Sequence, residues 1–312
     1  MSPLGRSNPE LQLLRRLSRR RSVRSAEGVY LVDGPVLLTE ALEAGVAVRT
    51  VYVERDATRD AVHLVADAAA DAGVQVREVM PGALAKVLDV TTPQSVVAVV
   101  ERTEAELAEV VSDATRTARP LLVLESVADP GNVGTLVRTA EASGCAGVVL
   151  VGACADRFNP KTVRSTAGAI FRVRVAEVAD VGELAAAATA AGLAMVGAVG
   201  GAGETPERCE LRGAVAILVG SEAHGLSAAA LGRCDRTVAI PMEGRVESLN
   251  AAVAGSVLAF EAARQRRAGD AAASPADRSG GTTTGVGHND RPVATGSLRS
   301  ERPAPEHGSP PR

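Results

Sequence analysis

Aromatic side chains are nearly missing from this chain of 312 residues, which has no Trp, two Tyr and three Phe. RNA-binding modules that stack bases on exposed rings need more aromatic residues than this, so the composition excludes them. The four cysteines are far apart and show no CxxC spacing, so we expect reduced, mostly buried thiols and no zinc site. Apolar runs are too short to span a membrane, and the polar, basic N-terminus has no apolar signal segment. We therefore expect a cytoplasmic protein with neither a metal site nor a membrane segment.

Charge of one sign is not in excess either: the net charge is −3 and the pI is about 5.9. A uniformly basic nucleic-acid coat protein is therefore excluded, and any basic surface must be local. Lysine occurs only at Lys86 and Lys161, so arginine supplies nearly all the cationic side chains. The side chains that are abundant in this sequence are aliphatic. Hydrophobic residues make up 46% of it, enough for a sizeable core, and the length is near that of two domains.

The N-terminal segment, residues 1–24, holds seven arginines against a single acid, Glu10. Leucines lie between the arginines, so the segment can form a short helix with one apolar side and one cationic side. Two interpretations stay open at this point. The helix is either simply solvated, or it is a phosphate-binding surface on which an anion offsets the repulsion between like charges.

Two stretches alternate regularly between strand and helix patterns, which predicts two α/β domains. In the first, strands are predicted at 29–33, 49–54, 74–79 and 95–100, and helices at 35–44, 59–72 and 81–88. In the second, strands are predicted at 121–126, 147–151, 172–175, 194–199, 215–220 and 237–241, and helices at 133–143, 159–170, 181–191 and 249–264. Continuous aliphatic runs such as LLVLES and VAILVG are typical of buried parallel strands.

These patterns divide the chain into a basic segment (1–24), a first α/β domain (25–103), a polar helical linker (104–119), a second α/β domain (120–267) and a tail (268–312). Large apolar residues nearly vanish from the tail, where Pro, Gly, Ser and Thr dominate. Such a composition cannot bury enough surface to order itself, so we expect the tail to be disordered.

Three loops at strand ends of the second domain could carry chemistry, because ligands of parallel sheets bind beyond the carboxyl ends of strands. In the first loop, Gly131 and Gly134 let the backbone approach a ligand, and the helix that begins there offers free N–H groups to an anion. Arg138 lies one turn into that helix, on the face of Gly134. The alternative is an ordinary turn into a helix with a solvated arginine. No GxGxxG fingerprint or P-loop is present, and this argues against a nucleotide-dependent oxidoreductase.

The second loop carries Glu222, which could be a carboxylate at a helix N-terminus or an acid of a ligand site. His224 is expected to be an exposed loop residue rather than a catalytic base. In the third loop, Ser248 is expected to cap the following helix. That helix is crowded with Ala, Gly and Ser, which fits either tight packing within the domain or packing against a partner subunit.

The combination and order of these loops resemble the SpoU (TrmH) family of RNA ribose 2′-O-methyltransferases. The matching motifs are Asn132-x-Gly134-x-x-x-Arg138, Gly220-x-Glu222-x-x-Gly225-Leu226, Ile240-Pro-Met-x-Gly244 and Ser248-Leu249-Asn250. The segment Lys161-x-x-Arg164-Ser-x-Ala-Gly168 also looks like the family's sequence between the first two motifs. The resemblance covers residues 121–264. The first domain is similar, less specifically, to the ribosomal-protein-like substrate-binding domain often fused in front.

The resemblance implies a second domain with a deep C-terminal trefoil knot, which ordinary rules of chain topology make rare. It also implies a homodimer, and S-adenosylmethionine held in the knot largely by backbone groups. Carried over to this sequence, those groups belong to Gly220, Ile240 and Leu249.

The reaction that the resemblance implies is in-line attack of a ribose 2′-oxygen on an activated methyl group, for which the protein mainly positions the nucleophile. Family proposals give the arginine that matches Arg138 a role in activating the hydroxyl, but a guanidinium is a poor base. We favour Arg138 as a phosphate clamp that stabilises the developing alkoxide, with a deprotonated Arg138 as the open alternative. Asn132 and Asn250 would orient the substrate or the arginine. Glu222 would fix the arginine or the neighbouring loop, and Ser248 would contact the nucleotide or only cap its helix.

Contacts to RNA phosphates must come mainly from arginine, and the first domain is expected to select its target by RNA shape. The candidate contacts are Arg15, Arg16, Arg19, Arg20, Lys161 and Arg164. Large-subunit (23S) ribosomal RNA is the expected substrate by analogy with proteins of this two-domain plan, and transfer RNA is second. A non-catalytic RNA-binding or ribosome-assembly protein on the same fold is the rival, and loss of cofactor binding would identify it.

Overall fold

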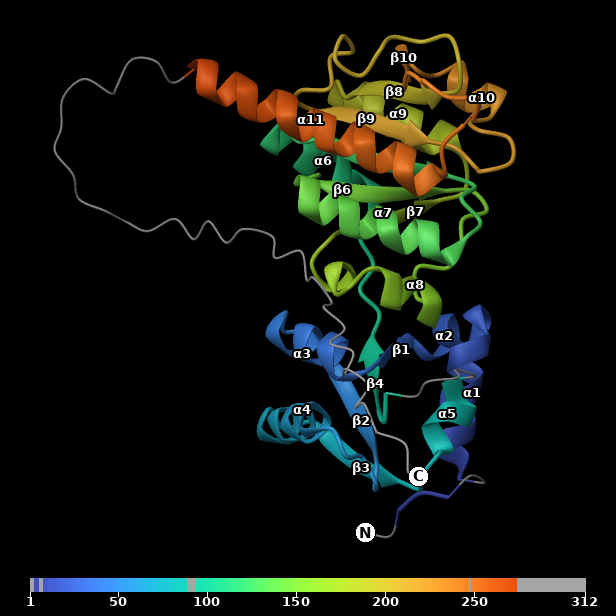
Figure 1. Ribbon diagram of the computed structural model, residues 1–312, viewed down its shortest axis with the longest axis vertical. Helices are drawn as coiled ribbons and strands as arrows, with labels where there is room; N and C mark the ends of the chain where they lie inside the picture. The colour runs from blue at the N-terminus through green and yellow to red at the C-terminus, as the bar shows by residue number, and fades with distance from the viewer. Residues whose placement is uncertain (1–2, 6–7, 89–93, 247, 274–312) are drawn as a thin grey trace, which may run out of the picture. The chain divides into compact units, whose positions relative to one another are not determined.

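The computed structural model describes residues 3–5, 8–88, 94–246 and 248–273 (Figure 1). Two β-sheets lie in the unit that ends at Ala272, a mixed one of four strands and a parallel one of six. Helices pack on these sheets, so the predicted α/β class is confirmed. No helix within the described ranges is long and apolar enough to cross a membrane.

The first sheet has the strand order β1-β4-β2-β3. Its strands are β1 (Val29–Asp33), β2 (Val48–Glu54), β3 (Gln75–Val79) and β4 (Val96–Glu101). β4 pairs antiparallel with β1 and β2, whereas β3 pairs parallel with β2. Aliphatic cores join one face to α1 (Pro9–Arg19) and α5 (Ala83–Leu88), and the other face to α3 (Pro35–Glu43) and α4 (Asp60–Asp71). All the elements predicted for this sheet are present, with ends shifted by at most two residues.

The basic N-terminal segment forms two helices, α1 and α2 (Arg21–Glu27), instead of the single helix that the pattern predicts. Arg20 separates them because its backbone is extended, with φ −120° and ψ 113°. Leu11, Leu14 and Leu17 of α1 are buried against the first sheet, and the arginines between them are exposed. The predicted two-sided character of this segment is therefore confirmed.

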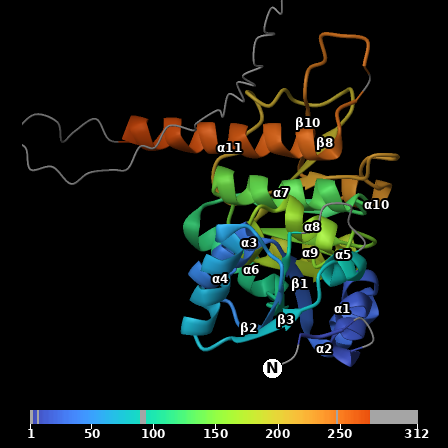
Figure 2. The ribbon, with the colours of Figure 1, turned by 60° about the horizontal axis from the view of Figure 1, so that its bottom comes forward.

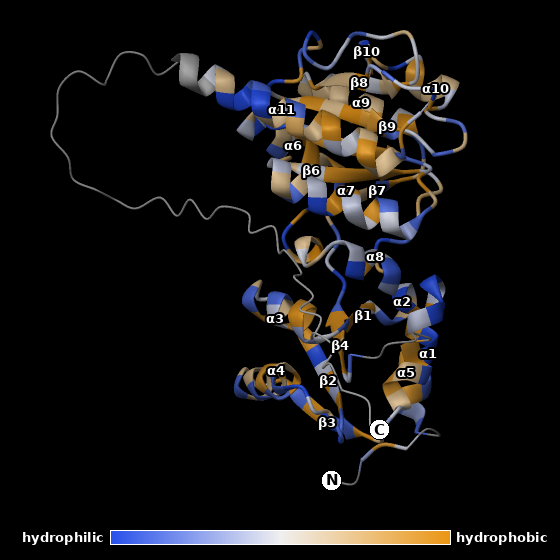
Figure 3. Ribbon diagram, viewed as in Figure 1, coloured by the Kyte–Doolittle hydropathy of each residue, from blue (hydrophilic) through white to orange (hydrophobic). Residues whose placement is uncertain are grey.

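The second sheet is parallel throughout, in the order β10-β8-β9-β5-β6-β7. Its strands are β5 (Leu121–Glu125), β6 (Gly147–Val151), β7 (Val175–Val178), β8 (Ala194–Val199), β9 (Val215–Val219) and β10 (Arg236–Ala239). One core holds α7 (Pro130–Ser143) and α11 (Ala251–Ala273), and a second holds α6 (Leu107–Thr117), α9 (Val181–Ala191) and α10 (Ala228–Leu231). The central strands β5, β6 and β9 are buried along their whole length, and Figure 3 shows β6 and β9 as hydrophobic.

Helix α11 runs beside α7 in both ribbon views (Figures 1 and 2). Gly255 of α11 meets Leu136 of α7 so closely that an added Cβ would lie 2.5 Å from the leucine side chain. Nearby, the hydroxyl oxygens of Thr139 and Ser256 are 2.8 Å apart. The small residues of α11 thus serve tight packing within the domain, one of the two interpretations of that pattern.

The predicted polar helical linker, residues 104–119, contains α6, which packs against the second sheet. Val110, Val111 and Ala114 of α6 are buried in the core of the second sheet. The composition of 104–119 is polar, but its apolar residues fall on one face of the helix, and that face decides where the helix packs. The proposed domain boundaries stay predictions.

Two further predictions about 159–175 are wrong. The helix predicted at 159–170 is broken into α8 (Pro160–Ser165) and the 3-10 turn η1 (Ala169–Phe171). Ala167 and Gly168 lie between them with φ of 48° and 93°, which no helix continues through. The next strand consequently begins three residues further along the chain than predicted: β7 spans Val175–Val178 rather than 172–175.

At the C-terminal end, α11 begins at Ala251 and continues to Ala273, past residue 268, where the tail is predicted to begin. The rest of the predicted tail, from residue 274, lies outside the described residues. Helix α10 is missing from the prediction because its four residues are too few for a periodic pattern. The trefoil knot stays a prediction.

Candidate functional site

A cavity of about 350 Å³ opens at the carboxyl ends of β8, β9 and β10. The chain runs outward from β5 to β6 and β7, then crosses to the other side of β5 to form β8, β9 and β10. Ligands of parallel sheets bind where the strand order reverses in this way. The wall of the cavity is formed by Ala198–Gly201, Val219–Gly225, Val238, Ile240, Met242, Ser248, Leu249, Ala251 and Ala254.

Gly220, directly after β9, sits where two stretches of backbone cross. A Cβ added there would lie 2.1 Å from the carbonyl carbon of Gly225 and 2.2 Å from the amide nitrogen of Leu226. Ser221 and Gly225 exchange two backbone hydrogen bonds, of 3.1 and 2.9 Å, so the loop between them is closed on itself. Only glycine fits at position 220, and the cavity is therefore walled there by bare backbone.

The three residues predicted to hold the cofactor, Gly220, Ile240 and Leu249, all line this one cavity. They come from separate loops, so the fold brings them together. A further stretch of the wall, at Gly200 and Gly201, is missing from the predicted site. The sequence signal for this stretch is the pair of glycines directly after the strand that ends at Val199.

A chain of side-chain hydrogen bonds joins all three loops at the edge of the cavity. Asn132 Nδ2 donates to Glu222 Oε1 at 2.5 Å, and Asn250 Nδ2 donates to Asn132 Oδ1 at 3.1 Å. Of these three residues, Glu222 lines the cavity itself. Glu222 thus fixes the first loop to the second, one of the two roles expected for it.

Asn250 also caps α11, the helix that follows the third loop. Its Oδ1 accepts from the backbone N–H groups of Ala252 at 2.9 Å and Val253 at 3.3 Å. The prediction that Ser248 caps this helix is therefore wrong, because α11 begins at Ala251 and its cap is the residue just before. Ser248 instead lines the cavity.

Replacing Asn250 separates its two tasks. Asn250→Asp keeps the oxygen acceptors that cap α11 but loses the donor to Asn132, so we expect stability within about 0.5 kcal/mol of wild type with lower activity. Asn250→Ala loses both and should lower the free energy of unfolding by about 1 kcal/mol. Denaturant unfolding and an activity assay measure the two effects. Equal stability losses in both variants would show that the cap contributes nothing.

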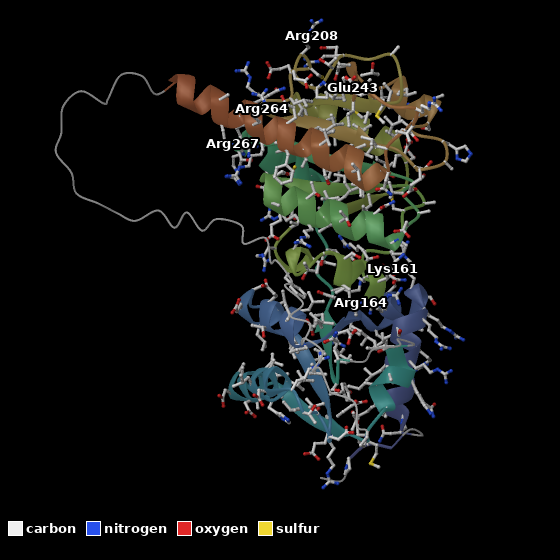
Figure 4. All side chains as sticks on the ribbon, in the orientation of Figure 1. Lys161, Arg164, Arg208, Glu243, Arg264 and Arg267 are labelled. Atoms are coloured by element: carbon white, nitrogen blue, oxygen red, sulfur yellow. The ribbon has the colours of Figure 1, made fainter. Side chains whose placement is uncertain are left out.

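Lys161 and Arg164, two of the predicted phosphate contacts, lie on α8 (Figure 4) and each faces a carboxylate. Lys161 Nζ is 2.9 Å from Asp129 Oδ2, and this contact lowers the pKa of Asp129. Arg164 Nη1 is 3.4 Å from Oδ2 of Asp33, whose pKa is nevertheless raised because the carboxyl is buried. Any phosphate contact by these two cations would compete with their carboxylate partners.

Arg138 takes no part in the chain of hydrogen bonds that joins the loops. Its side chain is on the exposed side of α7 and contacts no hydrogen-bond or ion-pair partner within the described ranges. It does not line the cavity. The fold therefore brings together the loops of Asn132, Glu222, Ser248 and Asn250 but leaves Arg138 facing outward.

A parallel sheet with a backbone-lined cavity at the carboxyl ends of its strands, bordered by a polar chain from three loops, is typical of an α/β enzyme with a nucleotide-type ligand site. Residues 119–260 match the model of the SpoU rRNA Methylase family, and residues 8–98 match that of the MRM3-like substrate binding domain.

Curated relatives and solved structures agree with this assignment. The 23S rRNA (guanosine(2553)-2′-O)-methyltransferase RlmP of Bacillus subtilis is 33% identical over 76% of this chain and 89% of its own. The 23S rRNA (uridine(2479)-2′-O)-methyltransferase of Streptomyces viridochromogenes is 31% identical over 86% of this chain and 94% of its own. The crystal structure of the SpoU methyltransferase AviRb of that organism with AdoMet has a TM-score of 0.73 and 30% identity, covering 83% of this chain and 98% of that one.

The chain belongs to the SpoU rRNA methylase family. The prediction of an S-adenosylmethionine-dependent RNA ribose 2′-O-methyltransferase, with a substrate-binding domain in front, is confirmed at the level of family and enzyme class.

Proposed function

We propose that this protein transfers a methyl group from S-adenosylmethionine to a ribose 2′-hydroxyl of 23S ribosomal RNA. The observation that carries the proposal is the meeting of the three motif loops at one cavity. Both relatives named above are 23S rRNA 2′-O-methyltransferases, and their matches cover 76% and 86% of this chain, more than the second domain alone. An enzyme with this substrate works in the cytoplasm, where bacterial ribosomes are assembled.

The cavity fits S-adenosylmethionine in size and lining. Small and apolar residues such as Val238, Met242 and Ala251 line it together with the backbone of Gly220. Glu222 is the carboxylate among the lining residues and His224 the imidazole, so the cavity carries little charge of its own. Gly220, Ile240 and Leu249 would hold the cofactor. When bound, it supplies an electrophilic methyl group on a sulfonium.

The residues of the chain then position and activate the ribose oxygen. Asn132 and Asn250, already linked by a hydrogen bond, would orient the RNA beside the cavity, and Ser248 would contact the nucleotide. Arg138 would donate hydrogen bonds to the adjacent phosphate and to the 2′-oxygen, while the 2′-hydroxyl releases its proton to solvent water. A guanidinium stays protonated at neutral pH, so Arg138 acts by its positive charge rather than as the base.

The RNA would lie along α1, on one face of the first sheet. Arg15, Arg16, Arg19 and Arg20 are exposed there. Helix α4, on the opposite face, is acidic, with Asp60, Asp67 and Asp71 exposed. Because RNA is a polyanion, this asymmetry favours the α1 face.

A homodimer would cover α11. Val253, Val257 and Phe260 are 48%, 40% and 47% exposed, and their spacing of four and three residues places them on one face of the helix. An exposed apolar stripe of this kind is typical of an interface. Light scattering should give twice the mass of the chain, and a monomeric mass at micromolar concentration would contradict this part of the proposal.

Methyl transfer to purified RNA tests the function. With labelled S-adenosylmethionine, we expect incorporation into 23S rRNA from a strain lacking the enzyme, at a nucleotide that resists alkaline cleavage. Transfer RNA should remain unlabelled. Labelling of transfer RNA, or of a base, would contradict the proposal. Absence of both cofactor binding and labelling in folded protein would favour a non-catalytic RNA-binding module.

The salt dependence of RNA binding tests the α1 surface. Arg15→Gln/Arg16→Gln should weaken 23S rRNA binding and reduce the slope of log affinity against log salt by about 0.7–0.9 for each phosphate that the protein no longer neutralises. Arg116→Gln/Arg208→Gln makes the same charge change at exposed sites outside the first domain. An equal loss of affinity in both double variants would refute a local phosphate-binding surface.

A further inference from the structure

Glu125 is a buried carboxylate at the reversal point of the second sheet. It ends β5, one residue beyond Leu124, which pairs with Val219 of β9. At the carboxyl end of the sheet, Glu125 therefore lies next to the start of the loop that carries Gly220. Only 9% of Glu125 is exposed, yet it does not line the cavity.

Both oxygens of Glu125 are used by a single residue, Ser227. The backbone N–H of Ser227 donates to Oε2 at 2.8 Å, and its hydroxyl donates to Oε1 at 2.7 Å. The same hydroxyl oxygen accepts from the N–H of Ala230 at 3.0 Å and so caps α10. Ser227 follows the cavity loop directly, so the loop's return limb is tied to β5 at the point where it leaves the cavity.

The cavity loop therefore has two anchors. Its tip is tied by Glu222 to Asn132 at an exposed site. Its return limb is tied by Glu125 to Ser227 at a buried one. A carboxylate removed from water must keep its donors, so displacing the return limb would leave Glu125 buried and unpaired.

We infer that Glu125 is a positioning residue for the cofactor site: through Ser227 it holds the loop from Gly220 to Leu226 in the shape that receives S-adenosylmethionine, without touching the cofactor. The inference rests on the proposed function only in taking S-adenosylmethionine as the ligand of this cavity.

Calorimetric titration of the purified protein with S-adenosylmethionine tests it. Glu125→Gln and Ser227→Ala should each bind about tenfold more weakly, the order of magnitude for one lost hydrogen bond to a charged group. The double variant should bind no more weakly than the weaker single variant, because both changes break the same link. Ser227→Thr, which keeps the hydroxyl, should bind like wild type.

Two further measurements separate positioning from general stability. KM for S-adenosylmethionine should rise about tenfold while kcat at saturation stays within twofold. Hydrogen exchange of residues 220–227 in the protein without cofactor should speed up, with exchange in β6 unchanged. Glu101→Gln is the matched control, since Glu101 also ends a strand but is exposed and pairs with Arg49.

Wild-type affinity in folded Glu125→Gln and Ser227→Ala would overturn the inference, as would additive losses in the double variant. If Glu125→Gln does not fold, Ser227→Ala alone decides, because it removes the hydroxyl donor to Oε1 and leaves the charge of Glu125 in place. Failure of wild-type protein to bind S-adenosylmethionine would instead overturn the choice of ligand, and the exchange measurement would still report on the anchor.

Discussion

Gly220→Ala is expected to lower the free energy of unfolding by on the order of 3 kcal/mol and to weaken S-adenosylmethionine binding at least ~100-fold. The added methyl group would lie 2.1 to 2.2 Å from backbone atoms of Gly225 and Leu226. Because these neighbours are backbone and are held by two hydrogen bonds between Ser221 and Gly225, they cannot rotate away as a side chain could. The loop must move, and the wall of the cavity moves with it.

Gly244→Ala is the control for this substitution. Gly244 lies in the third motif, but a Cβ added there meets no heavy atom within 4 Å, and its φ is not in the left-handed region. Denaturant unfolding and calorimetric titration should give near wild-type values for this variant. Wild-type stability and affinity in Gly220→Ala would show that the two crossing stretches are free to separate.

Much of the second sheet can be predicted from the sequence because its strands are continuous aliphatic runs that end at glycine or polar residues. β6, β8 and α9 occupy the predicted residues without any shift. Prediction fails where contacts distant in sequence decide the local structure. Gly168, for example, lies against Glu40 of α3 with φ 93°; the glycine permits a break in the helix predicted at 159–170, but its contact with α3 cannot be predicted from that stretch.

The site shows the same division. Gly220, Ile240 and Leu249 can be predicted from the motif resemblance, because each motif is a local sequence with its own residue types. In the structure all three line one cavity. The link between Glu125 and Ser227 joins residues 102 positions apart and belongs to no motif. A carboxylate at a strand end gives no sign of its partner in the sequence, so only the fold identifies it.

Arg138→Ala is expected to lower kcat about 10²–10³-fold, the size of effect seen when a group that stabilises a developing oxyanion is removed. Affinity for S-adenosylmethionine should stay within twofold of wild type, because Arg138 does not line the cavity. Stability should stay within about 0.5 kcal/mol, because Arg138 is exposed and loses no partner within the described ranges. Single-turnover methyl transfer, calorimetry and denaturant unfolding measure the three quantities. A large loss of cofactor affinity would contradict the assignment.

Arg138→Lys distinguishes the charge of Arg138 from a role as base. A lysine keeps the positive charge but loses the planar fork that grips a phosphate, so an electrostatic clamp predicts partial activity. The pH at which the rate rises should then be the same in both proteins, since neither cation gives up its proton in the reaction. A base predicts the opposite. An ammonium group loses its proton at lower pH than a guanidinium, so the rising limb of the pH–rate profile would move to lower pH in the lysine variant. Such a shift of the pH–rate profile would show that Arg138 acts as a deprotonated base and not as an electrostatic clamp.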